Sequence, residues 1–218
     1  MKNKVLMFCG ILAPVVYVIT VILGGILWPA YSHVSQAVSD LIATGAPNKS
    51  LLDPLFALYN GLTIAFGFGL FLYVRSTNQN RGKVAGTLGA LVLVAEGIFG
   101  VITLFFPEPV GGMSAAITST GTLHIVFASL CSLTTMLAIL FMGFWFRNSP
   151  HQRGYGRYSF VSVAVVFVSG GLAAVGVATQ SPVSGLFERV TMGGWLQWLF
   201  VIALMLYSAE VTSASSVK

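Results

Sequence analysis

Long apolar stretches alternate with short polar segments along the whole chain, and most of the charged residues lie in the polar segments. An apolar stretch of about 20 residues, coiled as a helix, crosses the roughly 30 Å hydrocarbon core of a bilayer. Six such stretches occur, so the pattern predicts an all-α fold, a polytopic transmembrane bundle of six helices. The predicted spans are 5–27, 54–74, 84–106, 122–146, 159–178 and 192–209.

Composition agrees with this pattern and excludes an ordinary soluble domain. Hydrophobic residues make up 56% of the chain and charged residues only 8%, whereas a soluble domain carries about 25% charged residues. The longest predicted connection, 28–53, is too short for a separate soluble domain. We therefore expect residues 1–218 to form a single integral membrane domain.

The first span follows Lys2 and Lys4, as the apolar region of a signal peptide would. It is longer than such a region, and no small-x-small cleavage site follows it, so we expect a retained anchor. The two cysteines, Cys9 and Cys131, lie in different spans at different depths. We therefore expect no disulfide between them.

Lysine and arginine are distributed unequally between the two sides of the predicted bundle, which sets its orientation because these residues resist translocation. One side carries nine and the other only Lys49 and Arg189. We therefore expect a multi-pass protein of the plasma membrane with both termini in the cytoplasm. The net charge of +5 then reflects topology and contact with the lipid bilayer, and nucleic acid is not an expected partner. The nine residues are Lys2, Lys4, Arg75, Arg81, Lys83, Arg147, Arg153, Arg157 and Lys218.

The first outer connection contains an amphipathic stretch at 31–42. At helical periodicity His33, Gln36 and Asp40 share one face, so we predict a short interfacial helix. This helix could lie on the membrane surface with its polar face in water, or it could turn that face inward over a site. Spacing alone leaves both interpretations open.

Glu96 lies near the centre of the third span, where a charged side chain is costly, so it is a candidate functional residue. The structural alternative is a neutral carboxyl that hydrogen-bonds to a neighbouring helix. His124, Asn60 and Gln197 lie at comparable depths in the outer halves of their spans. Together they predict a polar pocket that opens toward the outer side.

Histidine with carboxylates suits zinc, which makes His33, His124 and Glu108 weak candidates for metal ligands. No closely spaced metal motif, nucleophile elbow or phosphate-binding loop occurs in the sequence, so no metal is predicted and no cofactor is indicated. The sequence gives no indication of oligomeric state.

Three short motifs resemble one family. They are Tyr31-Ser32-His33-x-Ser35, Phe106-Pro107-Glu108 with His124 after it, and Gly185-Leu186-Phe187-Glu188-Arg189. Together they are similar to the domain-of-unknown-function family 998 of bacteria and archaea. The resemblance implies a six-span prokaryotic membrane protein with a common outer-face site at His33, Glu108, His124, Glu188 and Arg189, and it implies no particular reaction. Glu108 stands where the family usually has Asp, which lengthens the acidic arm.

Three functional hypotheses follow. In the first, an outer pocket binds, and in one version modifies, a lipid headgroup or another amphiphile. Its candidate catalytic groups are His33, Asp40, Glu108 and His124, Arg189 would contact an anion, and the other ligand-binding candidates are Gln36, Asn60, Glu96, Glu188 and Gln197. The second hypothesis is a carrier for a small solute or a proton-coupled substrate that uses Glu96. The third is a non-catalytic membrane partner or sensor that docks proteins on its basic inner face.

Overall fold

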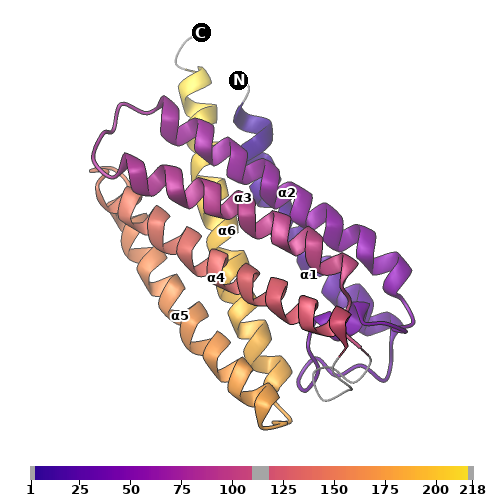
Figure 1. Ribbon diagram of the computed structural model, residues 1–218. Coiled ribbons are helices and arrows are strands. Elements are labelled where there is room, and N and C mark those ends of the chain that lie inside the picture. The colour runs from indigo at the N-terminus through magenta and orange to yellow at the C-terminus, as the bar shows by residue number, and fades with distance from the viewer. Residues whose placement is uncertain (1–2, 110–117, 216–218) are drawn as a thin grey trace.

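The computed structural model describes residues 3–109 and 118–215, and these form six long helices and one short 3-10 helix (Figure 1). Each long helix is long and apolar enough to cross a membrane, which confirms the predicted class. Lys2 and Lys218, counted above for topology, lie outside the described residues. The elements are α1 (Asn3–Leu27), η1 (Ser39–Ile42), α2 (Lys49–Ser76), α3 (Lys83–Phe105), α4 (Ser119–Arg147), α5 (Arg153–Ala178) and α6 (Ser184–Ser215).

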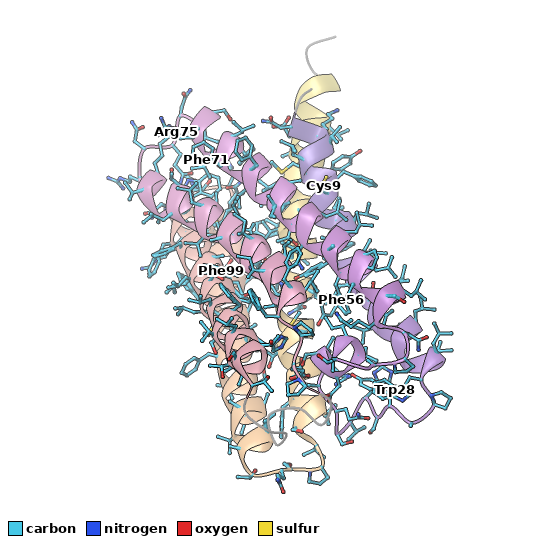
Figure 2. The ribbon with its side chains drawn as sticks, turned by 45° about the vertical axis from the view of Figure 1, so that its right-hand side comes forward. Cys9, Trp28, Phe56, Phe71, Arg75 and Phe99 are labelled. Atoms are coloured by element: carbon cyan, nitrogen blue, oxygen red, sulfur yellow. The ribbon has the colours of Figure 1, made fainter. Side chains whose placement is uncertain are left out.

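The helices pack in chain order around a ring. Each helix contacts the next one in the sequence, and α6 packs back against α1, which closes the ring. The amino-terminal start of α1 and the carboxyl-terminal end of α6 therefore lie at the same end of the bundle (Figure 1). Figure 2 shows Arg75 at this end and Trp28 at the opposite end.

The two ends of the bundle carry opposite charge. We call the end with the termini the basic end, because Lys4 and the basic residues of the 75–83 and 147–157 regions lie there. The opposite end, which we call the acidic end, carries Asp40, Asp53, Glu108 and Glu188.

The sixth helix starts eight residues earlier than the span that was predicted at 192–209. Glu188 and Arg189 fall between the spans predicted at 159–178 and 192–209, but they lie on α6. The hydropathy pattern stops at this charged pair, whereas nothing in Ser184–Arg189 prevents a helix from continuing past the apolar core. The connection between α5 and α6 is therefore only 179–183.

The short helix predicted in the first outer connection is present but is confined to Ser39–Ile42. Side chains hold the preceding residues in turns: Gln36 Oε1 accepts from the Ser32 amide at 2.7 Å, and Asp40 Oδ2 accepts from the Ala37 amide at 3.0 Å. Such local bonds compete with helical backbone bonds. His33 and Gln36 consequently precede the helix and do not share a helical face with Asp40.

The half of the bundle near the basic end is closely packed. The Trp145 ring lies against Gly86, and Trp198 donates from Nε1 to Ser159 Oγ at 2.9 Å. Gly156 allows α5 to approach the backbone of α4 at Arg147. Toward the acidic end, in contrast, α4 and α5 diverge (Figure 1).

Candidate functional site

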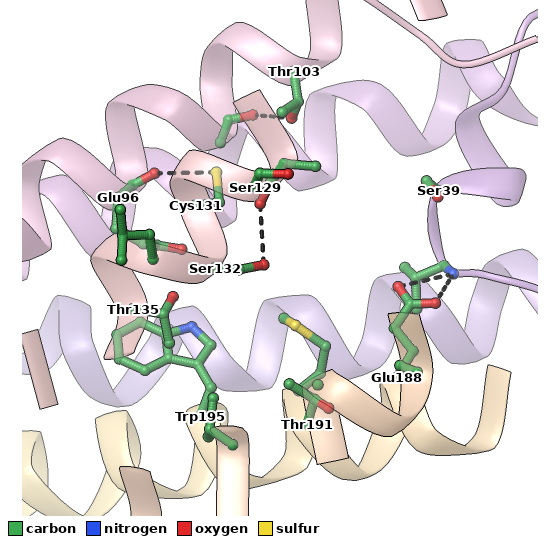
Figure 3. Close-up of a pocket in the computed structure, with 18 of the residues that line it drawn as sticks. Ser39, Glu96, Thr103, Ser129, Cys131, Ser132, Thr135, Glu188, Thr191 and Trp195 are labelled. Carbon is green, nitrogen blue, oxygen red and sulfur yellow. Dashed lines mark hydrogen bonds between the residues drawn. The ribbon is translucent and has the colours of Figure 1, made fainter. Parts of the chain in front are cut away.

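A cavity of about 800 Å³ occupies the half of the bundle near the acidic end (Figure 3). All six long helices and η1 contribute to its wall, and most of the lining side chains are apolar. The polar minority includes four residues singled out from the sequence, namely Asn60, Glu96, His124 and Glu188.

The cavity opens sideways between α4 and α5. Leu133 on α4 and Phe167 and Leu172 on α5 line the cavity, yet they are also exposed on the outside of the bundle, Phe167 to 67%. Among the described residues, no atom beyond the local helix backbone lies within 4 Å of the place where a Cβ atom on Gly171 would sit. The side wall is thus incomplete at a level where lipid chains would surround the protein.

Glu96 lies in the wall contributed by α3 and is only 5% exposed. Its Oε2 atom is buried and has no hydrogen-bond partner among the described residues. Figure 3 shows its side chain beside Cys131 and Thr135 of α4. A buried polar atom without a partner is unusual and costly, so it marks a place where an additional donor would stabilise the protein.

Glu188 lies at the other end of the cavity (Figure 3). Both of its carboxylate oxygens accept from the Val38 amide, at 3.1 and 3.3 Å. This bond attaches the first outer connection to α6 and closes the cavity beneath Ser39. Glu188 therefore has a partner within the protein, unlike the free oxygen of Glu96.

Arg189 points away from the cavity because consecutive helical residues are about 100° apart. Its guanidinium donates to His33 Nδ1 at 3.3 Å, to the backbone oxygens of Gln36 and Gly185 at 2.8 and 2.9 Å, and to the Tyr31 hydroxyl. Four of the five guanidinium N–H groups are thus directed at the protein. These contacts make Arg189 the anchor of residues 31–36 and do not support the anion contact predicted for it.

Asp40 of η1 and Glu108, which follows α3, form a pair of interacting carboxyl groups. Burial raises the pKa of Glu108 to about 7; a hydrogen bond from Ser39 lowers it, while the nearby charge of Asp40 raises it further. Burial also raises the pKa of Asp40, against the opposing effect of the Ala37 amide. The backbone oxygen of Glu108 accepts from the Thr44 amide at 2.9 Å, so Glu108 also contacts the first outer connection through its backbone.

The two histidines of the predicted site have separate partners. His124 lines the cavity, and its Nδ1 donates to the Phe106 backbone oxygen at 2.9 Å, since a carbonyl oxygen can only accept. His33 is exposed beside Arg189, and its pKa is lowered by desolvation and by that charge. His33, Glu108 and His124 are thus not gathered into one cluster. No group of three or more His, Cys, Asp or Glu residues within 3–109 and 118–215 is arranged to hold a metal.

The remaining polar candidates divide between the cavity and the exterior. Asn60 lines the cavity and lies over Gly100 of α3, where any side chain would collide with it. Gln36 lies outside the cavity, where its side-chain oxygen accepts a hydrogen bond from the Ser32 amide and so supports the first outer connection. Gln197 is exposed on the outside of α6 and does not contribute to the wall. It lies at a suitable depth, but its position around the helix axis faces away from the cavity.

Sequence reasoning missed the aromatic part of the site. Tyr17, Tyr59 and Trp195 line the cavity; Trp195 donates from Nε1 to the Tyr59 hydroxyl at 2.9 Å, and the Tyr17 and Tyr59 rings meet edge to face at 4.9 Å. A signal was present, because tyrosine in membrane proteins favours the interfaces, whereas Tyr17 lies in the middle of its span.

A comparison with family models matches residues 11–205 to a family described as a protein of unknown function, DUF998. The match covers most of the chain and includes every candidate residue discussed above. No curated protein and no solved structure matches the chain. The resemblance seen in the three short motifs is therefore confirmed, and the chain belongs to the domain-of-unknown-function family 998.

Proposed function

We propose that this protein binds an amphiphile, which enters the cavity from the surrounding lipid through the opening between α4 and α5. The observation that carries the proposal is the combination of an apolar cavity of about 800 Å³ with a lateral opening made of exposed apolar side chains. Pockets for small molecules commonly measure about 300–1,000 Å³. A lipid chain or a molecule of similar size would fit.

The distribution of polar groups also favours an amphiphile over a water-soluble solute. The polar lining residues Asn60, Glu96, His124 and Glu188 come from α2, α3, α4 and α6, whereas α5 contributes a mainly apolar surface from Val166 to Val175. A ligand with one polar and one apolar part matches this division. Its apolar part would leave the lipid for a surface of similar polarity, so entry requires little desolvation.

We place the acidic end on the outer side of the plasma membrane. The proposal rests on the basic residues in the short connections at the opposite end, which resist translocation. Both termini would then be cytoplasmic, and the cavity would draw its ligand from the outer leaflet.

A carrier is the second candidate, because Glu96 offers an unpartnered carboxyl oxygen at the bottom of the cavity. Transport would require an opening through the packing of Trp145 and Trp198 near the basic end, both of which are buried. Uptake of a labelled amphiphile into sealed proteoliposomes separates this alternative from binding alone.

Photolabelling tests the binding proposal. A dodecyl amphiphile that carries a photoreactive diazirine in its chain, added to protein in lipid nanodiscs, should label cavity-lining peptides from 128–136 of α4 and 166–175 of α5. Gly171→Leu places a side chain in the open part of the wall, where it should obstruct entry of the probe. Labelling at these peptides should fall about tenfold, which corresponds to a steric cost to probe binding of ~1.4 kcal/mol.

Gly61→Leu is the matched control. Gly61 is also exposed on a long helix with open space around it, but it does not line the cavity. This variant should label as the wild type does. Equal labelling in the wild type and Gly171→Leu, or labelling spread evenly over all lipid-facing peptides, would count against the proposal.

A further inference from the structure

We infer that the amphiphile bound by this cavity is cationic and that its ammonium group pairs with Glu96. The inference rests on the proposed function and adds the charge of the ligand. It is carried by three properties of the cavity: the charges in its wall, the missing partner of Glu96, and the aromatic side chains that line it.

The charges that line the cavity are acidic. Glu96 and Glu188 both belong to the wall, and none of its described residues is lysine or arginine. Arg189 follows Glu188 directly in the sequence, but it directs its guanidinium to the first outer connection. An anionic headgroup would meet two carboxyl groups and neither lysine nor arginine among the described lining residues, which disfavours it in a medium of low dielectric constant.

Glu96 is the group that requires a partner. Glu188 already accepts from the Val38 amide, whereas the buried Oε2 atom of Glu96 accepts from no described group. An unpaired carboxylate in an apolar interior is strongly disfavoured, and a cation beside it supplies both charge compensation and, for a primary amine, hydrogen-bond donors. None of the described residues that line the cavity supplies such a cation, whereas a cationic ligand would.

Three aromatic side chains line the cavity together with Glu96. Tyr17, Tyr59 and Trp195 contribute to the same wall as Glu96. The faces of tyrosine and tryptophan attract ammonium groups, more strongly when the site is desolvated. A carboxyl group together with three such rings is an arrangement that favours a cation over a neutral headgroup.

The lateral opening lies at the same depth in the bundle as Glu96. Cys131 Sγ lies 3.8 Å from the Glu96 backbone oxygen, and the exposed residues Ser132 and Leu133 follow directly on α4. Glu96 lies nine residues before the end of α3 at Phe105, which places it about 14 Å below that end at 1.5 Å per residue. A group that enters sideways from the lipid therefore reaches Glu96 without passing through the acidic end.

Competition against the photoreactive probe tests the charge of the ligand. Dodecyltrimethylammonium, dodecyl maltoside and dodecyl sulfate share one chain and differ in charge, and nanodiscs of zwitterionic phosphatidylcholine avoid a bias from the lipid surface. We expect the cationic competitor to displace the probe at a concentration about tenfold lower than the neutral one, because it alone pairs with Glu96. The anionic competitor should be the weakest.

Glu96→Gln should abolish the advantage of the cationic competitor and leave the neutral competitor unchanged, which also shows that the cavity of the variant is intact. Asp53→Asn is the control, since it removes a carboxylate of the acidic end that pairs with Lys49 outside the cavity. Equal potency of cationic and neutral competitors, or a cationic preference that survives in Glu96→Gln, would overturn this inference while the binding proposal stands. Absence of specific labelling in the wild type would instead overturn the binding proposal.

Discussion

Individual carboxyl groups differ sharply in their surroundings, although all of them lie in a mostly apolar protein. Asp53 is paired with Lys49 at 2.6 Å, Glu188 accepts from a backbone amide, and Glu108 is buried beside Asp40. Only position in the fold distinguishes these environments. Carboxyl groups thus form a surface ion pair, a bond to the backbone and a buried pair in one chain.

Glu108 gives a pH-dependent prediction. Burial raises its pKa from an ordinary value of 4.5 to about 7 in the folded protein. Its contribution to stability is therefore fully present below pH 4.5 and is lost as the pH rises through about 7. Hydrogen exchange at the Thr44 amide, which donates to the Glu108 backbone oxygen, should be slower at pH 5 than at pH 8 after correction for the intrinsic rate.

Glu108→Gln should remove this difference, because the amide does not titrate, whereas Asp53→Asn should retain it. Identical corrected protection of Thr44 at both pH values in the wild type would contradict the role given to Glu108.

Several site residues could be predicted from the sequence, and the reason others could not is geometric. Glu96 stood out because a carboxyl in the middle of an apolar span is costly wherever it points. Gln197 was predicted by depth alone, and its position around the α6 axis places it outside the wall. The role of Arg189 depended on the path of residues 31–36, which local side-chain bonds determine and which periodicity does not reveal.

At the scale of elements, the contact between α4 and α5 determines whether the cavity opens. The helices approach closely near the basic end, where Gly143 meets Ser159 and Phe160, and Gly156 meets the Arg147 backbone. They then separate toward the acidic end (Figure 1). The six spans could be predicted from hydropathy, but this divergence could not, because it depends on which small residues face each other across the pair.

Two glycines at the start of α5 test this contact. A Cβ on Gly156 would lie 2.7 Å from the Arg147 backbone nitrogen, whereas one on Gly154 would meet nothing within 4 Å outside the local helix backbone of the described residues. Gly156→Ala should lower the free energy of unfolding by ~1–3 kcal/mol through overpacking. Thermal unfolding in detergent, followed by circular dichroism, measures the change.

Gly154→Ala should be neutral or should stabilise the protein by up to about 1 kcal/mol, because alanine favours the helix. If the two variants unfold at the same temperature, close packing at Gly156 is not what holds α4 to α5.

At the scale of the whole molecule, the unequal distribution of charge predicts the orientation. In a background with Cys9→Ala and Cys131→Ser, single cysteines can be placed at Thr44 near the acidic end and at Asn78 near the basic end, both of which are exposed. A membrane-impermeant thiol reagent applied to intact cells should label the Thr44→Cys protein and not the Asn78→Cys protein. Lysed cells, in which both should react, provide the control, and the reverse pattern would invert the proposed topology.

The closed ring also has a consequence for how the protein is made. Among the described residues, the extensive contacts between long helices join neighbours in the sequence, except the contact of α6 with α1, which links the two ends of the chain. Since α6 contributes Glu188, Thr191 and Trp195 to the cavity, the cavity is not complete until the last helix of the ring has been inserted. A ligand that binds only the completed ring favours it by mass action. Under the proposed function, an amphiphile that occupies the cavity would therefore favour assembly of the ring, and the yield of assembled protein would rise with its concentration.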